Sequence, residues 1–245
     1  MSGLERSLVF LALALLAEVA GTVGGFGSSV FFVPIANLFF AFEAVLGITA
    51  LFHLASNLSK LGMFRGGIDR GLVLRIGVPS ILFAVGGAYA TAHVPTRGLE
   101  VALAVFLIGF SGWMLMHPEW SARPTASNAV LGGAVSGGMA GLVGTGGAIR
   151  GLTLAAFALP KEVFVATSAG IDLGIDLSRS IVYYRNGYMR GLELAWIPAL
   201  VMVAVVGTWL GRGLLRHVPQ QRFRQLALAM VAGIGMLTLY SAIRG

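Results

Sequence analysis

The sequence predicts an all-α protein that crosses a lipid bilayer several times. It is built from two related halves, each with a glycine-broken helix or hairpin followed by three spanning helices. Only 11% of the 245 residues are charged, whereas a soluble domain carries about 25%. Hydrophobic residues amount to 57%, and they gather in runs of about 20 residues, long enough to cross roughly 30 Å of hydrocarbon. These runs do not alternate with polar residues, which favours helices over barrel strands.

Eight apolar segments follow one another along the chain, and the first and fifth are long and interrupted by glycines. In order they are Leu4 to Ala41, Ala44 to Phe64, Leu72 to Ala92, Leu99 to Met116, Val130 to Leu159, Val163 to Tyr184, Leu192 to Leu215 and Phe223 to Ile243. A polar stretch with two prolines separates the fourth from the fifth. We therefore expect a first transmembrane repeat at 1–117, a linker at 118–128 and a second repeat at 129–245.

The two halves repeat one another in sequence at a shift of 120 residues. Gly21, Gly24 and Gly27 fall on Gly141, Gly144 and Gly147, and Arg65, Gly67, Arg70 and Gly71 fall on Arg185, Gly187, Arg190 and Gly191. The arginine–glycine pattern is the stronger match, because single glycines coincide easily in a chain with 35 of them. Duplicated halves with a broken segment at equivalent places are typical of secondary transporters. Because unwound backbone in a bilayer needs cover, we expect the two breaks to face each other near the midplane.

Two topologies are compatible with this duplication. If each broken segment is a hairpin, each half has an odd number of crossings and the repeats are inverted. If each broken segment spans the bilayer, the repeats are parallel. The inverted arrangement gathers roughly ten basic residues on one side against about six on the other, which makes the first side cytoplasmic. We favour the inverted arrangement.

The composition also limits which partners and cofactors the protein is expected to bind. The net charge of +7 would suggest nucleic acid in a soluble protein. No basic run with interleaved aromatic residues is present, so no nucleic-acid partner is expected and the charge is assigned to cytoplasmic loops. The absence of cysteine excludes disulfides and thiolate ligands. No His/Glu metal spacing appears either, so neither a metal nor a cofactor is expected.

The order and spacing of these motifs resemble the sulfite exporter TauE/SafE family of anion transporters. The matching stretches are GTVGGFG at 21–27 with Val33-Pro34, GLVGTGG at 141–147, KEVFVATS at 161–168 and RNGY at 185–188. The resemblance covers nearly the whole chain and implies transport of sulfite, sulfonates or related anions without ATP. The sequence departs from the family pattern near Leu154, which is not proline, and at Arg150, where a small residue is more usual. These departures leave the substrate open.

The two glycine breaks are the first part of the candidate substrate site. A broken helix exposes backbone N–H groups and a positive dipole end, which suit an oxyanion. The residues expected to cradle it are Gly24, Gly25, Gly27, Ser28 and Ser29 from the first half and Gly144, Thr145, Gly146 and Gly147 from the second. For a single glycine, close helix packing is the better explanation. Two symmetric runs favour a site.

Charged residues inside apolar segments are the second part of the candidate site. A charge inside a membrane is costly, so its presence indicates a function. Asp172 and Asp176 are four residues apart on one helix face, and Arg179 is three residues beyond Asp176. Two acids beside one arginine favour proton coupling by one acid, and a structural ion pair is the alternative. Glu18 and His53 are further candidates for proton coupling, with the alternatives of a neutral buried carboxyl and a satisfied core histidine.

The remaining candidates supply positive or polar groups to an anion. Arg150 follows the second break and could bind a sulfonate or carboxylate bidentately, or pair with a nearby acid. Lys60 is a candidate counter-ion, although it could also extend to the interface. Asn57, Ser168 and Arg179 complete the predicted substrate-binding set.

The sequence therefore predicts a secondary transporter of small organic or inorganic anions, proton- or charge-coupled, in the bacterial inner membrane. Its expected partners are the anion and the bilayer, and assembly into a homo-oligomer is left open. A channel or a cation permease is one alternative, because the buried acids could suit a cation. An intramembrane hydrolase would need Ser28 or Ser29 with His53, and the segment lacks a Gly-x-Ser-Gly pattern. We expect no enzymatic activity.

Overall fold

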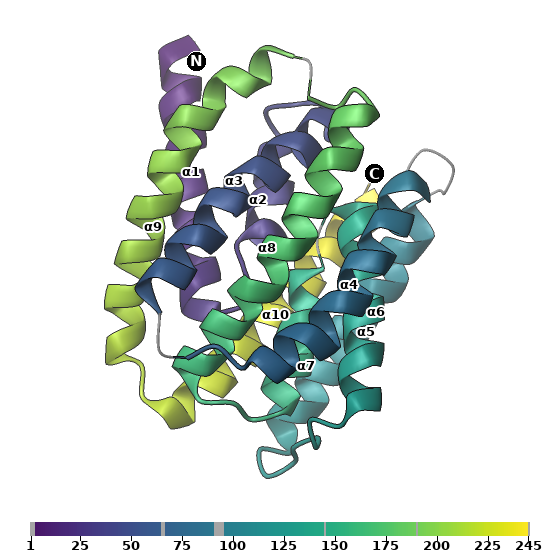
Figure 1. The fold of residues 1–245 in the computed structure, drawn as a ribbon. Helices are drawn as coiled ribbons and strands as arrows, with labels where there is room; N and C mark the ends of the chain where they lie inside the picture. Colours follow the sequence, from purple (N-terminus) through teal and green to yellow (C-terminus); the bar gives the residue numbers. More distant parts are fainter. Residues whose placement is uncertain (1–2, 65–66, 91–95, 145, 190, 245) are drawn as a thin grey trace.

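Two sets of five α-helices make up the computed structural model, which describes residues 3–64, 67–90, 96–144, 146–189 and 191–244 (Figure 1). The first half contains α1 (Gly3–Gly24), α2 (Ser29–Ala36), α3 (Phe42–Met63), α4 (Arg70–Ala90) and α5 (Thr96–Met116). The second contains α6 (Ala126–Val143), α7 (Gly147–Ala156), α8 (Lys161–Arg185), the 3-10 turn η1 (Leu192–Trp196), α9 (Ile197–His217) and α10 (Gln220–Arg244). Within the described ranges no strand occurs, and the all-α class is confirmed.

Each half opens with a long helix, a sharp break and a short helix. Gly25 and Gly27 between α1 and α2 have φ values of +80° and +91°, and Gly144 after α6 has +76°. Glycine adopts this left-handed region without strain, which explains why the breaks are glycine-rich. The helices α2 and α7 are only about 12 and 15 Å long at 1.5 Å per residue, too short to cross a bilayer.

The packing of the helices is reciprocal between the halves. The first long helix of each half lies against the third long helix of the other, since α1 packs on α9 and α6 on α4. The helix α3 packs on its counterpart α8, and α5 packs on its counterpart α10. Such a set of contacts is what an approximate two-fold relation between duplicated halves produces.

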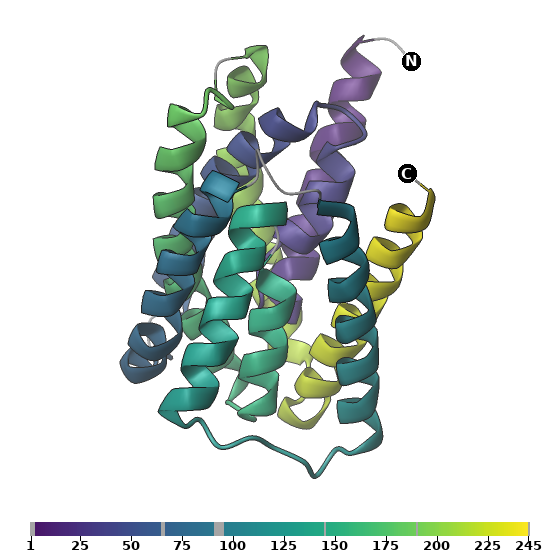
Figure 2. The same cartoon turned by 90° about the vertical axis from the view of Figure 1, so that its right-hand side faces the viewer.

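Corresponding helices run in opposite directions. In Figure 1, α1 descends from the N-terminus whereas α6 rises from the connection at the lower edge. Figure 2 shows α5 descending and α10 rising beside it. The connections at 67–69, 117–125, 157–160 and 218–219 lie at the lower ends of their helices. We call this side the basic face, because most of the described lysines and arginines lie near it.

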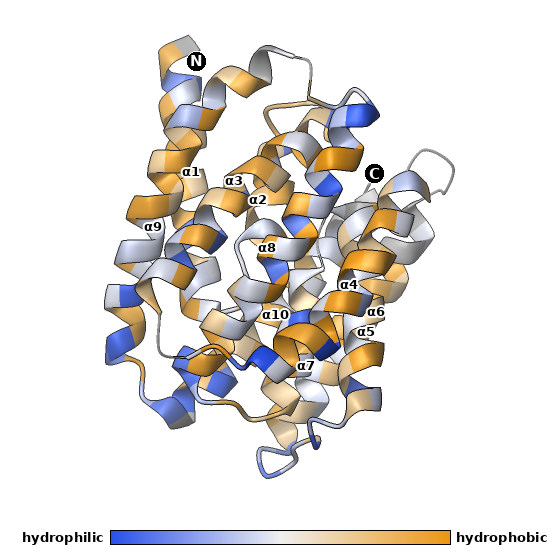
Figure 3. Cartoon of the chain, viewed as in Figure 1, coloured by the Kyte–Doolittle hydropathy of each residue, from blue (hydrophilic) through white to orange (hydrophobic). Residues whose placement is uncertain are grey.

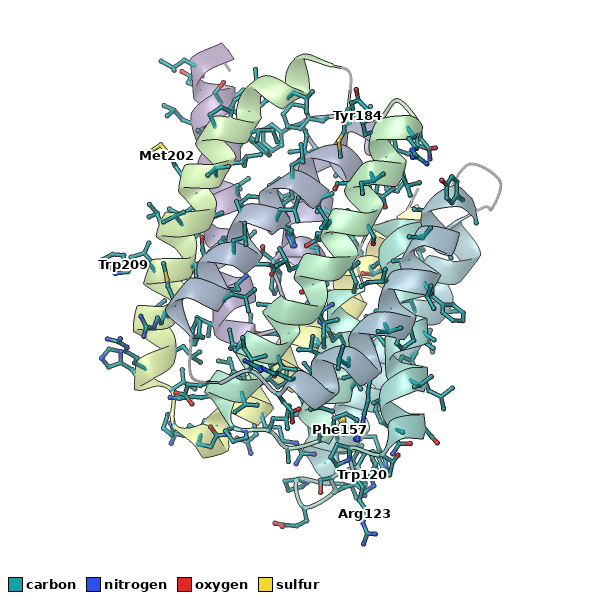
Figure 4. The ribbon with its side chains drawn as sticks, viewed as in Figure 1. Trp120, Arg123, Phe157, Tyr184, Met202 and Trp209 are labelled. Atoms are coloured by element: carbon teal, nitrogen blue, oxygen red, sulfur yellow. The ribbon has the colours of Figure 1, made fainter. Side chains whose placement is uncertain are left out.

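The outer surface of the helices is apolar, and the interior holds charges. Figure 3 shows hydrophobic residues along the outward helix faces and hydrophilic residues towards the basic face. Met202 and Trp209 point outward from α9 and are 69% and 64% exposed (Figure 4). Five helices are long and apolar enough to span a membrane: α1, α3, α4, α9 with the end of η1, and α10. An apolar outer surface with charged residues in the interior is expected for a protein that is surrounded by lipid.

Single cysteines in this cysteine-free chain test the orientation of the halves. Ile68 and Asn186 are exposed and follow α3 and its counterpart α8. If the repeats are inverted, a membrane-impermeant maleimide labels Ile68→Cys only from the cytoplasmic side and Asn186→Cys only from the opposite side. Labelling of intact cells and of inverted vesicles measures this, and reaction of both cysteines from the same side would contradict it.

Candidate functional site

Glu18 forms the first part of a buried polar core, which lies where α1, α3, α8 and α9 meet. It is fully buried, and its carboxylate accepts hydrogen bonds from hydroxyls on α1, the first break, α3 and α9. The donors are Thr22 Oγ1 at 3.2 Å, Ser28 Oγ at 2.5 Å, Ser56 Oγ at 2.7 Å and Thr208 Oγ1 at 3.0 Å. The Lys60 ammonium lies 2.9 Å from the same carboxylate. A buried charge is tolerated when it is paired and hydrogen-bonded, and Glu18 meets both conditions.

Lys60 lies in this core rather than at the interface. Its side chain is buried, and Nζ donates to Ser56 Oγ at 2.6 Å in addition to the contact with Glu18. Its charge is therefore balanced within the protein. A role for Lys60 as a substrate counter-ion requires that this ion pair separate.

A chain of polar contacts continues from Glu18 to α8. Ser28 Oγ is 3.1 Å from His53 Nε2, and His53 Nδ1 is 3.9 Å from Asp176 Oδ2. Asn57 Nδ2 donates to the same Asp176 oxygen at 2.8 Å. The predicted residues His53, Asn57 and Asp176 are thus brought together across the contact between α3 and α8.

Arg179 connects Asp176 to the second break. Its Nε and Nη2 lie 2.8 and 2.6 Å from Asp176 Oδ1, and Nη1 donates to the Gly144 carbonyl at 2.9 Å. The last carbonyls of a helix lack partners within the helix and carry its negative dipole end. Arg179 therefore stabilises the end of α6 as well as the carboxylate.

Arg150 joins the two glycine breaks. It is the fourth residue of α7 and is 1% exposed. Nε donates to Ser168 Oγ at 3.0 Å, Nη2 donates to the Phe26 carbonyl at 2.9 Å, and Nη2 also pairs with Asp172 Oδ2. Phe26 belongs to the first break, so one guanidinium contacts both halves. Its Nη1 atom is buried and has no hydrogen-bond partner.

Two glycines without side chains allow polar groups to approach this guanidinium closely. A Cβ on Gly147 would clash with the Phe26 carbonyl and would lie 3.5 Å from Ser29 Oγ. A Cβ on Gly27 would lie 3.2 Å from Asp172 Oδ2 and 3.7 Å from Arg150 Nη2. The helices α2 and α7 begin here, and neither N-cap residue, Ser28 or Gly146, caps its helix with a side-chain hydrogen bond. The two helix N-termini and Arg150 thus share one junction.

Other predicted break residues serve packing in this arrangement. A Cβ on Gly24 or Gly25 would press on the rings of Phe26 and Phe164, respectively. Gly144 lies against Leu46, and Gly146 lies against the backbone of α6. Thr145 lies outside the described residues. The polar side of the junction is formed by Gly27, Ser28, Ser29 and Gly147.

The model of the family described as sulfite exporter TauE/SafE matches residues 10–238 of the chain. The chain belongs to this family. No significant match is found among curated proteins or among solved structures. Membership makes the chain a membrane transporter rather than an enzyme, which confirms the family resemblance, the transport function and the expectation of no enzymatic activity.

The geometry of the TauE/SafE core also bears on the hydrolase alternative. Ser28, His53 and Asp176 follow one another as in a catalytic triad. The Ser28 hydroxyl, however, donates to Glu18, and 3.9 Å between His53 and Asp176 is too long for a hydrogen bond. Ser28 is fully buried, so its oxygen is not presented to a substrate.

Sequence reasoning missed three contributors to the core. Thr22 and Thr208 both donate to Glu18, and the Phe26 carbonyl accepts from Arg150. A single hydroxyl residue within the long apolar run of α9 was a usable signal for Thr208. A backbone carbonyl carries no sequence signal.

The pair of Glu18 and Lys60 gives a stability prediction for this TauE/SafE protein. Lys60→Gln leaves the Glu18 carboxylate buried without its cation, and we expect a loss of about 3–5 kcal/mol, as for buried pairs that lose one partner. The double variant Glu18→Gln/Lys60→Gln removes both charges and should recover most of the loss.

The thermal unfolding midpoint in detergent, followed by tryptophan fluorescence, measures both effects. Arg75→Gln, which removes an exposed charge, is the matched control and should be neutral. A Lys60→Gln midpoint equal to that of the parent protein would show that the pair does not stabilise the fold.

Proposed function

We propose that this TauE/SafE protein is a secondary transporter of sulfite or sulfonate-like anions in the bacterial inner membrane, and that the anion binds between the two glycine breaks. The observation that carries the proposal is Arg150, a buried guanidinium with a free Nη1 at the junction of both halves. Family membership supports transport, and the chemistry of this junction supports an oxyanion.

The electrostatics of the junction favour negative charge. The N-termini of α2 and α7 both begin there, and a helix N-terminus presents unpaired N–H groups and a partial positive charge. Guanidinium groups bind oxyanions through two parallel hydrogen bonds. A sulfonate has three oxygens, which suit Nη1 of Arg150 and the first-turn N–H groups together. Asp172 pairs with Nη2 of Arg150, so the substrate would compete with this carboxylate for the guanidinium.

The balance of buried charge supports coupling to a proton. In the described part of the chain, three buried cations (Lys60, Arg150 and Arg179) face three buried anions (Glu18, Asp172 and Asp176). The local sequence of α8 suggested two aspartates against one arginine. In the structure Arg150 is a second cation beside them, so both aspartates have a positively charged partner. An entering monovalent anion adds one negative charge to a neutral core, and an unpaired buried charge is costly. One proton taken up by His53 or by an acid of the core would offset it.

The same balance weighs against a cation permease. Each buried carboxylate named above already has a lysine or arginine partner. A cation would have to displace one of these side chains, whereas an anion finds the free Nη1 of Arg150.

Arg150→Gln should abolish sulfite uptake into proteoliposomes. It should also weaken sulfite binding about 10- to 100-fold, because a charge-assisted contact is lost. Because Arg150→Gln leaves Asp172 unpaired, the double variant Arg150→Gln/Asp172→Asn is the informative second protein, and it should fold without binding sulfite. Thermal stabilisation by sulfite measures binding, with Arg75→Gln as the control. Normal stabilisation in the folded double variant would remove Arg150 from the site.

Asp176→Asn should uncouple uptake from the pH gradient. The substitution removes one negative charge, so the core becomes positive by one and an anion can enter without a proton. We expect radiolabelled sulfite uptake with an acid gradient to fall to the rate measured without one, while sulfite binding persists. Glu43→Gln, at an exposed position, is the control. If Asp176→Asn keeps the parent ratio of the two rates, the acid has no role in coupling.

A further inference from the structure

A pocket of about 600 Å³ lies on the basic face, between the end of α3, the start of α8 and the end of α9. Gly62 and Phe64 line it from the first half, and Glu162, Arg212 and Arg216 line it from the second. The pocket therefore lies between the halves. Figure 3 shows hydrophilic residues gathered at this lower end of α9.

The charges of the pocket favour an anion. Arg212 and Arg216 are four residues apart and share one face of α9. The Arg212 guanidinium lies 5.6 Å from the centre of the Phe64 ring, which holds it at the pocket wall. Neither arginine takes part in any of the ion pairs found among the described residues. Glu162 contributes one negative charge, so the lining carries a net charge of +1.

The pocket lies directly below the polar core. Phe64 forms its wall, and the Phe64 N–H bonds to the Lys60 carbonyl one turn earlier in α3. Along α8, Ser168, which contacts Arg150, is six residues from Glu162, or about 9 Å at 1.5 Å per residue. An anion in the pocket is thus within a short distance of the proposed site.

The opposite end of the contact between α3 and α8 is filled. A Cβ on Gly47 would lie 2.9 Å from both Met189 Cγ and the Tyr188 carbonyl. Met189 is buried there in an apolar cluster with Tyr183 and Leu46. This end of the contact is covered by side chains, whereas the end on the basic face holds the pocket.

We infer that the pocket is an entry vestibule that collects small oxyanions from the basic side and passes them towards Arg150. The inference rests on the proposed function and adds a second anion site to it. A cleft whose lining has a net charge of one sign raises the local concentration of the opposite ion. Arg212 and Arg216 supply that field, and Glu162 limits it so that the anion is not held too tightly to leave.

A cysteine at Gly62 reports the field inside the pocket. A Cβ at this position meets no atom within 4 Å, so Gly62→Cys should be accommodated. We expect a methanethiosulfonate that carries a sulfonate to react about three to ten times faster than one that carries a trimethylammonium group. The ratio should fall towards one with Arg212→Gln/Arg216→Gln, rise with Glu162→Gln and stay unchanged with Arg75→Gln. Ile68→Cys, on the same face but outside the pocket lining, calibrates the reagents.

Transport kinetics test whether the pocket contributes to transport. With sulfite supplied on the basic side, Arg212→Gln/Arg216→Gln should raise KM about three- to tenfold at low salt, leave kcat within about twofold, and approach the parent KM at high salt. Equal labelling rates for the two reagents at Gly62→Cys, or a KM equal to that of the parent, overturns the inference. If Arg150→Gln still abolishes uptake in that case, the proposed function stands without the vestibule. If Arg150→Gln transports normally, the proposed function itself fails.

The two arginines of the pocket could also bind the phosphate of a lipid headgroup. Vesicles of different lipid composition distinguish this phosphate from a free oxyanion. The KM effect of the arginine variant should be the same in phosphatidylcholine vesicles and in vesicles that contain phosphatidylglycerol. An effect that appears only with phosphatidylglycerol would assign the arginines to a lipid headgroup and overturn the inference.

Discussion

The rest of this structure depends on the pairing of charges that lipid and apolar side chains would otherwise exclude. Among the described residues, three acids and three lysine or arginine side chains are buried inside the helical bundle, and each acid contacts one of these cations. Two of the pairs connect α1 to α3 and α7 to α8. The third pair lies within α8, and its Arg179 also donates a hydrogen bond to the Gly144 carbonyl at the end of α6. Removing one member would leave a charge that neither water nor lipid can solvate. The helices are thus held in register by polar contacts, while their outer surfaces remain free to meet lipid.

The sequence match between the halves extends to the glycine breaks of the fold but not to the buried charges. The glycines of the breaks after α1 and α6 match in sequence, and the packing of α1 on α9 and of α6 on α4 is reciprocal. At the shift of 120 residues, however, Arg150 corresponds to Val30, Asp176 to Ser56, and Lys60 to Ser180. Each half nevertheless balances its own described buried charges, Glu18 against Lys60 in the first half and two aspartates against two arginines in the second. The difference between the halves therefore lies in which charges they bury, and it places the unpartnered guanidinium atom of Arg150 in the second half.

The sequence allowed the helices, their order and the two breaks to be predicted, because apolar length and glycine clusters are local signals. It also identified most of the core, since a charge inside an apolar run is conspicuous at positions such as Asp172 and Arg179. Partners were harder to foresee. Glu18 and Lys60 are 42 residues apart in the chain, and only the packing of α1 on its neighbours brings Lys60 to this carboxylate. The count of acids and bases around Asp176 was wrong for the same reason, because Arg150 reaches α8 from another helix.

The bond from Arg150 to the Phe26 carbonyl has a thermodynamic consequence. The same guanidinium holds the backbone of the first half and has an unpartnered Nη1, which we propose as the contact for the anion. A displacement of one half relative to the other that changes this bond would also change the affinity of the proposed site for an anion. By reciprocity, an anion that binds one arrangement of the halves more tightly must shift the population towards that arrangement by the same free energy. Anion binding at the proposed site and the relative position of the halves are therefore coupled through the contacts of Arg150.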